Sequence, residues 1–383
     1  MSPETSRREN MTMRALYLIA IVLVVDGHTR FEDLFDMRGL FRYYSFHLML
    51  FAFASGYLLR DGDAEHPLRL LARRARRLLV PLYAWNFVYG AGAALLRRFG
   101  GFTLGEPLSA YTLLAAPLTD GEHFVWNLGA WYVFPLLLAQ AMYLLVRRLS
   151  RLWGGREPVT FLLCLIPGAI AVELCAAGQN DALPLFLMRA LILLPGLAGG
   201  VLYRRCLERH DNLPTVPYLL ALVIARALLC TRYENLAYLL SYCTYMDCGA
   251  VGVYLGGAIA IAFWLRIARL LAPYMQKSRL ALALSRHTFD VMMHHYMGFF
   301  ALNCVFLALH MLGLGAADFS VGALRTQSGY LYAPAGRQEW NVLYLIAGLI
   351  VPLLIGGAVR WLGARIKPVC ARVQARMHQA RRC

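Results

Sequence analysis

The stretch Ala15-Leu-Tyr-Leu-Ile-Ala-Ile-Val-Leu-Val-Val-Asp-Gly-His28 is almost wholly apolar until it ends in Asp26 and His28. Such a run predicts a membrane-spanning helix, since about 20 residues at 1.5 Å each cross roughly 30 Å of hydrocarbon. A titratable imidazole inside a span is costly. His28 therefore marks a functional site, and its partner has to be found.

The rest of the chain repeats this composition. Of its 383 residues, 59% are hydrophobic and 16% are charged, which excludes an ordinary soluble domain. We predict an all-α, polytopic membrane bundle of about ten helices, forming one domain over residues 1–383 with a short basic cytoplasmic tail at 362–383. The ten spans are expected near residues 13–29, 40–59, 78–97, 127–146, 158–177, 183–203, 214–231, 248–265, 288–311 and 340–361.

The basic residues predict the orientation of these spans. If the N-terminus is cytoplasmic, 28 of the 38 Lys and Arg residues fall in inner segments. The positive-inside rule then places both termini in the cytoplasm, and we expect a multi-pass protein of the plasma membrane. The net charge of +16 suits anionic inner-leaflet lipid, so nucleic acid is not needed as a partner.

The longest predicted outer loops cover residues 98–126, 232–247 and 312–339, and they are rich in aromatic and polar residues. Interfacial aromatic belts account for some of these residues, but the loops are also long enough to cover an outward-facing site. Cys243 and Cys248 fall in one of the loops. They are near enough in sequence to pair, although free thiols are more common at such positions.

Two histidines are expected at similar depth. His28 lies about 24 Å from a cytoplasmic helix start near residue 12, hence in the outer half of the bilayer. His47, in a span that enters from outside, lies at a comparable level. We therefore favour His47 as the residue that shares a cavity with His28, whereas Asp26, two residues before His28, points to another face of the helix.

A second polar group lies in the ninth span. Asp290 and His294 are four residues apart and share a helix face, the spacing at which a carboxylate can orient an imidazole. Near the cytoplasmic start of the span, they are expected to serve a cytoplasmic substrate or brace the fold rather than to touch His28. The role of the adjacent His295 is left open. The histidines carry no HExxH pattern, so no metal is expected.

Arginines cluster before the third predicted span, in Arg73-Arg74-Ala75-Arg76-Arg77. Guanidinium groups bind phosphates through paired hydrogen bonds as well as charge. The positive-inside rule alone also predicts arginines here. Both interpretations stay open on the residues themselves.

Taken in order, these motifs resemble the membrane-bound acyltransferase 3 family of bacterial sugar and lipid O-acyltransferases. The resemblance rests on the span ending in His28 and on Phe46-His-Leu-Met-Leu-Phe-Ala-Phe-Ala-Ser-Gly-Tyr57. It also includes Arg74-Ala-Arg-Arg77 followed by Pro81, Trp131-Tyr-Val-Phe-Pro135, and Ser285-Arg-His-Thr-Phe-Asp-Val-Met-Met-His-His-Tyr296. Leu48-Met49-Leu50 departs from the Met-Pro-Leu of many members, and Arg14 lies farther from His28 than the family spacing.

The resemblance implies an acyl-CoA donor, in the first place acetyl-CoA, on the cytoplasmic side and a carbohydrate or glycolipid hydroxyl presented from outside. His28 is then the catalytic base and His47 a supporting residue. Arg74 and Arg77, with Arg73 and Arg76, hold the phosphates of the donor. A direct transfer is favoured over an acyl-histidine intermediate.

Two other classes of function remain. A transporter of a small molecule or glycan precursor would use Arg189, Arg226 and Glu173 as a polar path, although the two halves show no matching broken helices. A non-catalytic scaffold would have no use for His28 at its depth.

Overall fold

The computed structural model describes residues 10–29, 36–37, 39–60, 62, 65–119, 124–233, 236 and 238–380. For Tyr43 and residues 367–380 it describes the backbone alone. Helix makes up 79% of the structure, and the described residues form no strand. The predicted all-α class is therefore confirmed.

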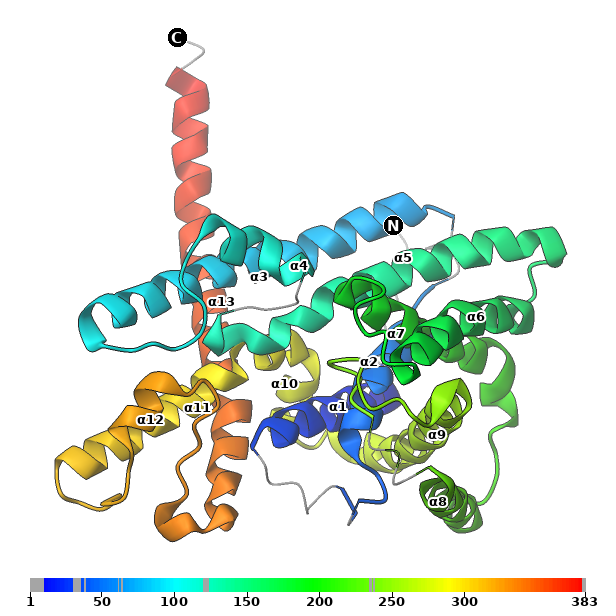
Figure 1. The fold of residues 1–383 in the computed structure, drawn as a ribbon. Coiled ribbons are helices and arrows are strands. Elements are labelled where there is room, and N and C mark those ends of the chain that lie inside the picture. The colour runs from blue at the N-terminus through cyan, green and yellow to red at the C-terminus, as the bar shows by residue number, and fades with distance from the viewer. Residues whose placement is uncertain are drawn as a thin grey trace.

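The helices follow one another along the chain (Figure 1). They are α1 (Met11–Thr29), α2 (His47–Tyr57), α3 (Pro67–Gly100), α4 (Ala116–Thr119), α5 (Val133–Ser150), α6 (Glu157–Ala176), α7 (Leu185–Leu202), α8 (Thr215–Arg232), α9 (Gly249–Met275), α10 (Arg279–Arg286), α11 (Thr288–Met311), α12 (Val321–Thr326) and α13 (Asn341–Ala380). Two short 3-10 helices, η1 (Tyr43–Ser45) and η4 (Val125–Tyr132), precede α2 and α5.

Nine helices within the described residues are long and apolar enough to cross a membrane. The second predicted span, residues 40–59, is the one for which the described residues include no such helix. Its helix, α2, has 11 residues and begins only at His47, after the separate turn η1. Its apolar residues are nearly all buried by other helices, so the hydrophobicity of this segment reflects a core position.

A seam of glycines holds α2 against α7. A Cβ atom added at Gly56 would lie 1.9 Å from the carbonyl oxygen of Leu197, and one at Gly200 would lie 2.0 Å from that of Phe53. Only glycine permits backbones to approach so closely, as in the small-residue contacts of membrane helices. This seam places α2, and with it His47, beside α1.

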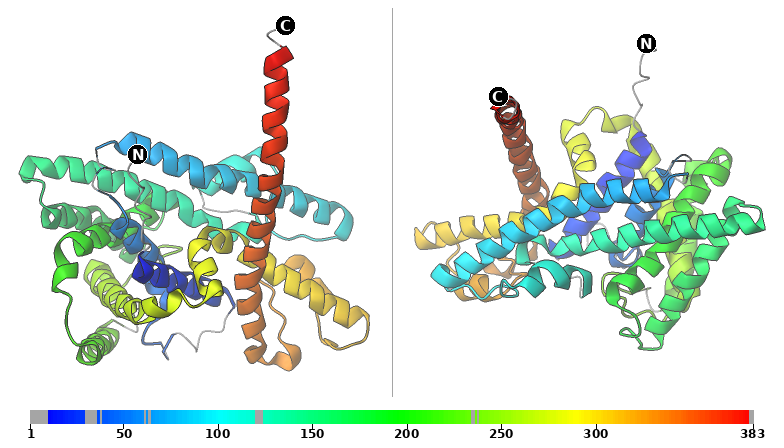
Figure 2. Two further views of the ribbon diagram at one scale, coloured as in Figure 1. Left: turned by 180° about the vertical axis from the view of Figure 1, so that it is seen from behind. Right: turned by 90° about the horizontal axis from the view of Figure 1, so that it is seen from above.

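A second close contact joins α11 to α13. A Cβ atom at Gly298 would lie 2.5 Å from the carbonyl oxygen of Ala347, and one at Gly348 would lie 2.6 Å from the Phe299 ring and 2.7 Å from Val25 of α1. The long α13 crosses α11 and then projects away from the other helices (Figure 2). The three helices α1, α11 and α13 thus meet around the middle of α11.

The segment between α11 and α13 is tied to these helices. Asn303 donates a hydrogen bond to the Tyr330 carbonyl at 2.8 Å and accepts one from the Tyr344 hydroxyl at 2.5 Å. Tyr332 bonds Asp318, and this hydrogen bond lowers the pKa of the Asp318 carboxyl. The segment after α12 is therefore fastened to both α11 and α13.

The cysteine pair suggested by the sequence is not bridged. Cys243 and Cys248 are both free thiols. The buried Cys243 thiol faces Cys175 at the end of α6, and its hydrogen bond with that neighbour raises the pKa of Cys243. A left-handed backbone at Cys243 (φ 54°) turns its side chain inward, which spacing in sequence does not reveal.

Candidate active site

His28, in the last turn of α1, meets two consecutive residues of α11. Its Nδ1 atom lies 2.9 Å from the hydroxyl of Tyr296. Its ring stacks on that of His295, with 5.1 Å between centroids and 22° between planes. The sequence favoured His47 as the partner of His28, and the structure adds a hydrogen bond to Tyr296 and a stacking contact with His295.

His295 has a defined tautomer. Its Nδ1 atom lies 3.0 Å from the carbonyl oxygens of both Val291 and Met292. Carbonyl oxygens only accept, so Nδ1 carries a hydrogen and Nε2 of the neutral ring carries the lone pair. This Nε2 atom is buried and has no hydrogen-bond partner among the described residues. A buried base thus lies directly against the ring of His28.

Packing fixes the position of His295. A Cβ atom at Gly129 of η4 would lie 2.8 Å from Cε1 of His295 and 2.6 Å from the Met292 carbonyl oxygen. Because Gly129 has no side chain, η4 can press its backbone against this turn of α11. On the other side, the His295 ring meets Phe299 edge to face, with 5.8 Å between centroids.

The adjacent His294 faces a different set of residues. Its Nδ1 atom lies 2.6 Å from the hydroxyl of Tyr89, and its ring meets Trp85 edge to face at 4.4 Å. Both partners belong to α3. Side chains of consecutive helical residues point about 100° apart. His294 therefore faces α3, whereas His295 faces His28 of α1.

Asp290 lies near the start of α11, as predicted for the cytoplasmic edge. Its carboxylate pairs with Arg360 of α13 and lies 3.6 Å from Nδ1 of His287. Burial and the nearby Arg360 cation lower the pKa of His287. This group joins the start of α11 to the middle of α13, and it does not orient His294.

His47 is buried at the start of α2, next to His28 but behind Tyr44. The Tyr44 hydroxyl donates to the carbonyl of Gly27, and its ring meets His47 edge to face at 5.7 Å. His47 also lies within electrostatic range of His28. The two histidines therefore belong to one site, with Tyr44 packed between their helices.

The other end of α1 carries Arg14. Arg14 and His28 are fourteen residues apart, which places them on one face of the helix about 21 Å from each other. Tyr17 shares this face. Its hydroxyl bonds Ser55 of α2 and lies in electrostatic range of Arg14 and Arg74. The Arg14 guanidinium also donates to the Ser285 carbonyl at 3.1 Å.

The four arginines of the predicted phosphate site do not share one environment. Arg74 is partly buried and donates to Gln140 of α5 at 2.6 Å. Arg73, Arg76 and Arg77 are exposed on α3. The structure thus brings Arg74 together with Arg14, and it leaves the other three on the surface of the same helical turn.

The buried charges outside this site are held by structural bonds. Arg226 donates to the carbonyls of Leu40 and Gly256 and to the Ser45 hydroxyl. Arg189 donates to the Ser241 carbonyl at 2.7 Å and lies 4.1 Å above the Trp131 ring. These guanidinium groups hold loops against helices through hydrogen bonds.

Glu173, the third residue of the alternative polar path, accepts a hydrogen bond from the backbone amide of Ala250 at 2.8 Å. Ala250 lies in the first turn of α9, whose positive dipole end favours an anion. No group of three or more metal-ligating side chains occurs in the described part of the chain.

Sequence reasoning missed His295 and Tyr296 as the neighbours of His28. Spacing along α11 indicated only that Asp290 and His294 share a face. The available signal was the unusual pair of adjacent histidines followed by a tyrosine in one span. The sequence alone does not show that these residues lie against His28, because that contact depends on the crossing of α1 and α11.

Comparison with known proteins gives one match. A family model described as an acyltransferase domain covers residues 14–361, nearly the whole chain. No curated protein and no solved structure matches the chain. The matched range includes every candidate site residue named above.

Proposed function

The chain belongs to the acyltransferase 3 family, and we propose that it is a plasma-membrane O-acyltransferase with cytoplasmic termini. In this proposal an acetyl group passes from cytoplasmic acetyl-CoA to a hydroxyl of an extracytoplasmic carbohydrate. The observation that carries the proposal is the position of His28, hydrogen-bonded to Tyr296 and stacked on His295, on the same α1 face as Arg14.

The chemistry assigned to His28 is general base catalysis. An alcohol is a weak nucleophile at neutral pH, and an imidazole within hydrogen-bond reach can take its proton as it attacks. When Nδ1 of His28 donates to the Tyr296 oxygen, Nε2 holds the lone pair needed for this step. In this proposal the Tyr296 oxygen accepts the hydrogen bond from Nδ1, which holds the ring in place and leaves Nε2 free to act as the base.

The transfer then balances without a further reactant. The acceptor oxygen bonds to the thioester carbonyl carbon as its proton moves to Nε2 of His28. The carbon–sulfur bond breaks, and the departing thiolate takes the proton back from the imidazolium. The products are an ester and free CoA thiol, and His28 returns to its starting state.

The donor end of the site is the arginine group around Tyr17. Arg74 and Arg14 would contact the phosphates first, because both already point toward one tyrosine. Arg73, Arg76 and Arg77 would add charge at the exposed rim. The separation of about 21 Å between Arg14 and His28 suits a donor that carries its thioester at the end of a long, flexible arm.

The transporter alternative has little support in the geometry. Its three candidate residues, Arg189, Arg226 and Glu173, are engaged in bonds that hold loops and a helix end. A transport path needs such groups to change partners during the cycle. The histidine site, by contrast, has an uncommitted base in His295 Nε2.

The test uses the purified full-length chain in lipid nanodiscs, with acetyl-CoA and an envelope glycan extract as acceptor. CoA release and glycan acetylation are followed together. We expect His28→Ala to lower the transfer rate by about 10²- to 10⁴-fold, the usual range for a general base. His310→Gln is the matched control, because His310 bonds a loop carbonyl at the far end of α11.

Transfer by the folded His28→Ala protein at the rate of the unmodified chain would contradict the catalytic assignment. Acetyl transfer to no acceptor in the extract, with intact binding of acetyl-CoA, would contradict the choice of a carbohydrate acceptor. If the protein transfers a different acyl group from its CoA thioester and does not use acetyl-CoA, the acetyl group in the proposal is wrong.

A further inference from the structure

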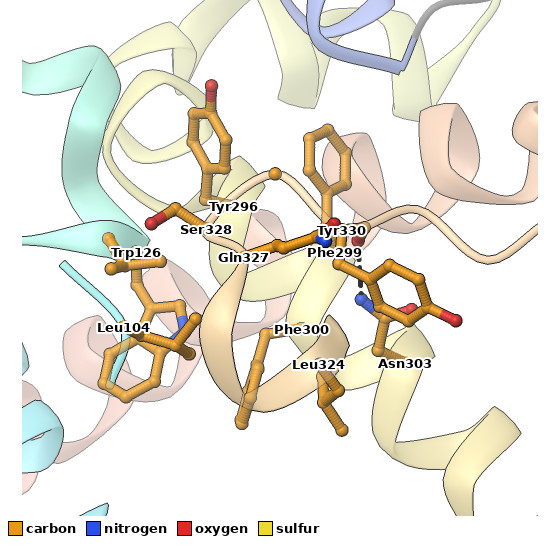
Figure 3. Close-up of a pocket in the computed structure, with 12 residues that line it drawn as sticks. Leu104, Trp126, Tyr296, Phe299, Phe300, Asn303, Leu324, Gln327, Ser328 and Tyr330 are labelled. Carbon is orange, nitrogen blue, oxygen red and sulfur yellow. Dashed lines mark hydrogen bonds between the residues drawn. The ribbon is translucent and has the colours of Figure 1, made fainter. Parts of the chain in front are cut away.

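A pocket opens beside Tyr296, on the side of α11 next to the predicted outer loops (Figure 3). Trp126, Phe299 and Phe300 form much of its wall, and Gln327, Ser328 and Tyr330 approach from the segment after α12. Tyr296 is therefore shared by the pocket and the histidine site, since it lines the pocket and its hydroxyl contacts His28.

The pocket combines aromatic surface with uncommitted polar groups. The indole N–H of Trp126 is buried and has no acceptor among the described residues. Trp126 and Phe300 lie 5.2 Å apart between ring centroids. A buried donor without a partner is unusual in a folded protein, and a ligand oxygen in the pocket would satisfy it.

The loop side of the pocket adds further hydrogen-bonding groups. The side chains of Gln327 and Ser328 are exposed and make no hydrogen bond within the part of the chain that the structure describes. Their backbone, however, is held in place, because Asn303 binds the Tyr330 carbonyl and Thr103 donates to the Arg325 carbonyl at 2.8 Å. The backbone of this wall is thus held in place before any ligand arrives, and the exposed side chains of Gln327 and Ser328 can turn to admit a ligand.

Charge narrows the class of ligand. None of the 12 lining residues is Asp, Glu, His, Lys or Arg. Burying an anion without a cationic partner is costly, so a phosphate or carboxylate group is a poor occupant. A pocket of aromatic faces with a few amide and hydroxyl groups suits a neutral ring with apolar faces and polar edges.

We propose that this pocket binds an uncharged sugar residue of the acceptor and presents it across Tyr296 to His28. The inference rests on the proposed function, since only a transferase needs an acceptor beside this base. It sharpens that function by favouring neutral glycans over phosphate-linked sugar precursors and over acidic polysaccharides.

The test measures binding without the donor. Maltotetraose, cellotetraose and chitotetraose serve as neutral probes and tetragalacturonate as the anionic probe, titrated against the full-length chain in nanodiscs by saturation-transfer NMR. We expect at least one neutral probe to bind, and tetragalacturonate to bind at least tenfold more weakly. The combined variant Gln327→Ala/Ser328→Ala should weaken the neutral probe at least fivefold, and Trp126→Phe about tenfold.

Matched controls come from the same loop. Trp340→Phe and Gln338→Ala change an exposed tryptophan and an exposed glutamine that do not line the pocket, and they should bind the probe like the unmodified chain. If Trp126→Phe fails to fold, the Gln327→Ala/Ser328→Ala variant still tests whether the sugar binds in this pocket.

Three results would overturn the inference. These are no binding by any neutral probe, equal binding of tetragalacturonate, or unchanged binding by the pocket variants. The failure of the proposed function is separate from these. If His28→Ala releases CoA normally, the catalytic assignment fails, whereas the binding results for the pocket variants still decide whether the pocket takes a neutral sugar.

Discussion

The two ends of α1 differ in how their polar groups are held. At one end, His28 is enclosed by the rings of His295 and Tyr296, and η4 presses against the same turn of α11. At the other end, Arg14 lies near partly buried Arg74, with three more arginines exposed on α3. The first end is built of rigid rings, the second of long flexible side chains.

The difference matches the demands of the proposed reaction. Proton transfer needs a base whose ring is held within a narrow geometry before the substrate arrives. Phosphate binding tolerates flexible guanidinium groups, because charge acts over longer distances and in many directions. Substitutions at the ring end should therefore act on kcat, and those at the arginine end on KM for the donor.

After His28→Ala itself, the largest effect is expected from Tyr296→Phe at the ring end. This change removes the hydroxyl that holds Nδ1 of His28 and keeps the ring that lines the pocket. Loss of a hydrogen bond to the catalytic base should lower kcat by roughly 10- to 100-fold. Steady-state CoA release at several pH values measures it, and the pH profile should move because the base has lost a positioning bond.

A purely structural role for Tyr296 would give a different result. The free energy of unfolding would fall, while kcat and the pH profile of the folded fraction stayed the same. Unchanged kcat in a stable Tyr296→Phe protein would break the contrast between the two ends of α1.

At the arginine end, Arg74→Gln should raise KM for acetyl-CoA about tenfold with little change in kcat. The partly buried guanidinium of Arg74 reaches Gln140 and faces Tyr17, so its charge lies inside the bundle. Arg74→Lys should recover part of the affinity, since it keeps the charge but loses the paired hydrogen bonds.

Arg73→Gln is the matched comparison, because the same change is made one residue away on the exposed side of α3. We expect its KM to rise less than about threefold, as solvent screens exposed charges. Equal effects at both positions would mean that the arginines act as one surface patch, without the inward site at Arg74.

A smaller effect is expected from Gly129→Ala. The added methyl group would meet the Met292 carbonyl and the His295 ring, forcing α11 to shift against η4. We expect kcat to fall about threefold to tenfold as His295 moves under His28, with a loss of stability of about 1–3 kcal/mol. Gly199→Ala is the control, because its methyl group would meet Phe161 at an ordinary 3.7 Å.

If Gly129→Ala lowers stability but leaves kcat unchanged, the stacking of His295 on His28 has no part in catalysis. If Gly199→Ala lowers kcat equally, the effect belongs to helix packing in general. Either result would mean that only His28 and Tyr296, and not His295, contribute to catalysis at this end of α1.

Much of this arrangement was accessible from the sequence. Apolar runs predicted the helical membrane class, and His28 stood out because an imidazole at its depth is costly. Helical spacing also placed Asp290 near the start of its span, where it pairs with Arg360. These features depend on local periodicity and on composition, which a single chain displays directly.

The contacts between helices were not accessible in the same way. The segment 40–59 reads as a span on hydropathy, yet α2 is short and buried, because close contact through Gly56 and Gly200 supplies the apolar surroundings. His295 likewise acquires its role only where α11 crosses α1. Such crossings depend on which small residues meet across a seam, and periodicity within one helix carries no such information.

The smallest effect concerns the loop beside the pocket, farther from the ring end of α1. Asp318 accepts a hydrogen bond from Tyr332, which keeps the pKa of the carboxyl below its usual range, and burial with this bond raises the pKa of Tyr332 to about 12. A carboxyl with a lowered pKa stabilises the folded loop above its ordinary pKa of about 4, and this contribution disappears as the pH falls through the lowered value.

Asp318→Asn should therefore weaken binding of the neutral tetrasaccharide by about twofold at neutral pH, since an exposed bond contributes little. In the unmodified chain, affinity for the tetrasaccharide should fall by the same factor on acidification below about pH 4. In the variant, affinity should not change over that pH range. Glu339→Gln changes an exposed carboxylate of the same segment between α11 and α13 and serves as the control. A pH response in Asp318→Asn equal to that of the unmodified chain would assign the acid sensitivity to another group, and the pocket wall would then depend on Asn303 and Tyr344 alone.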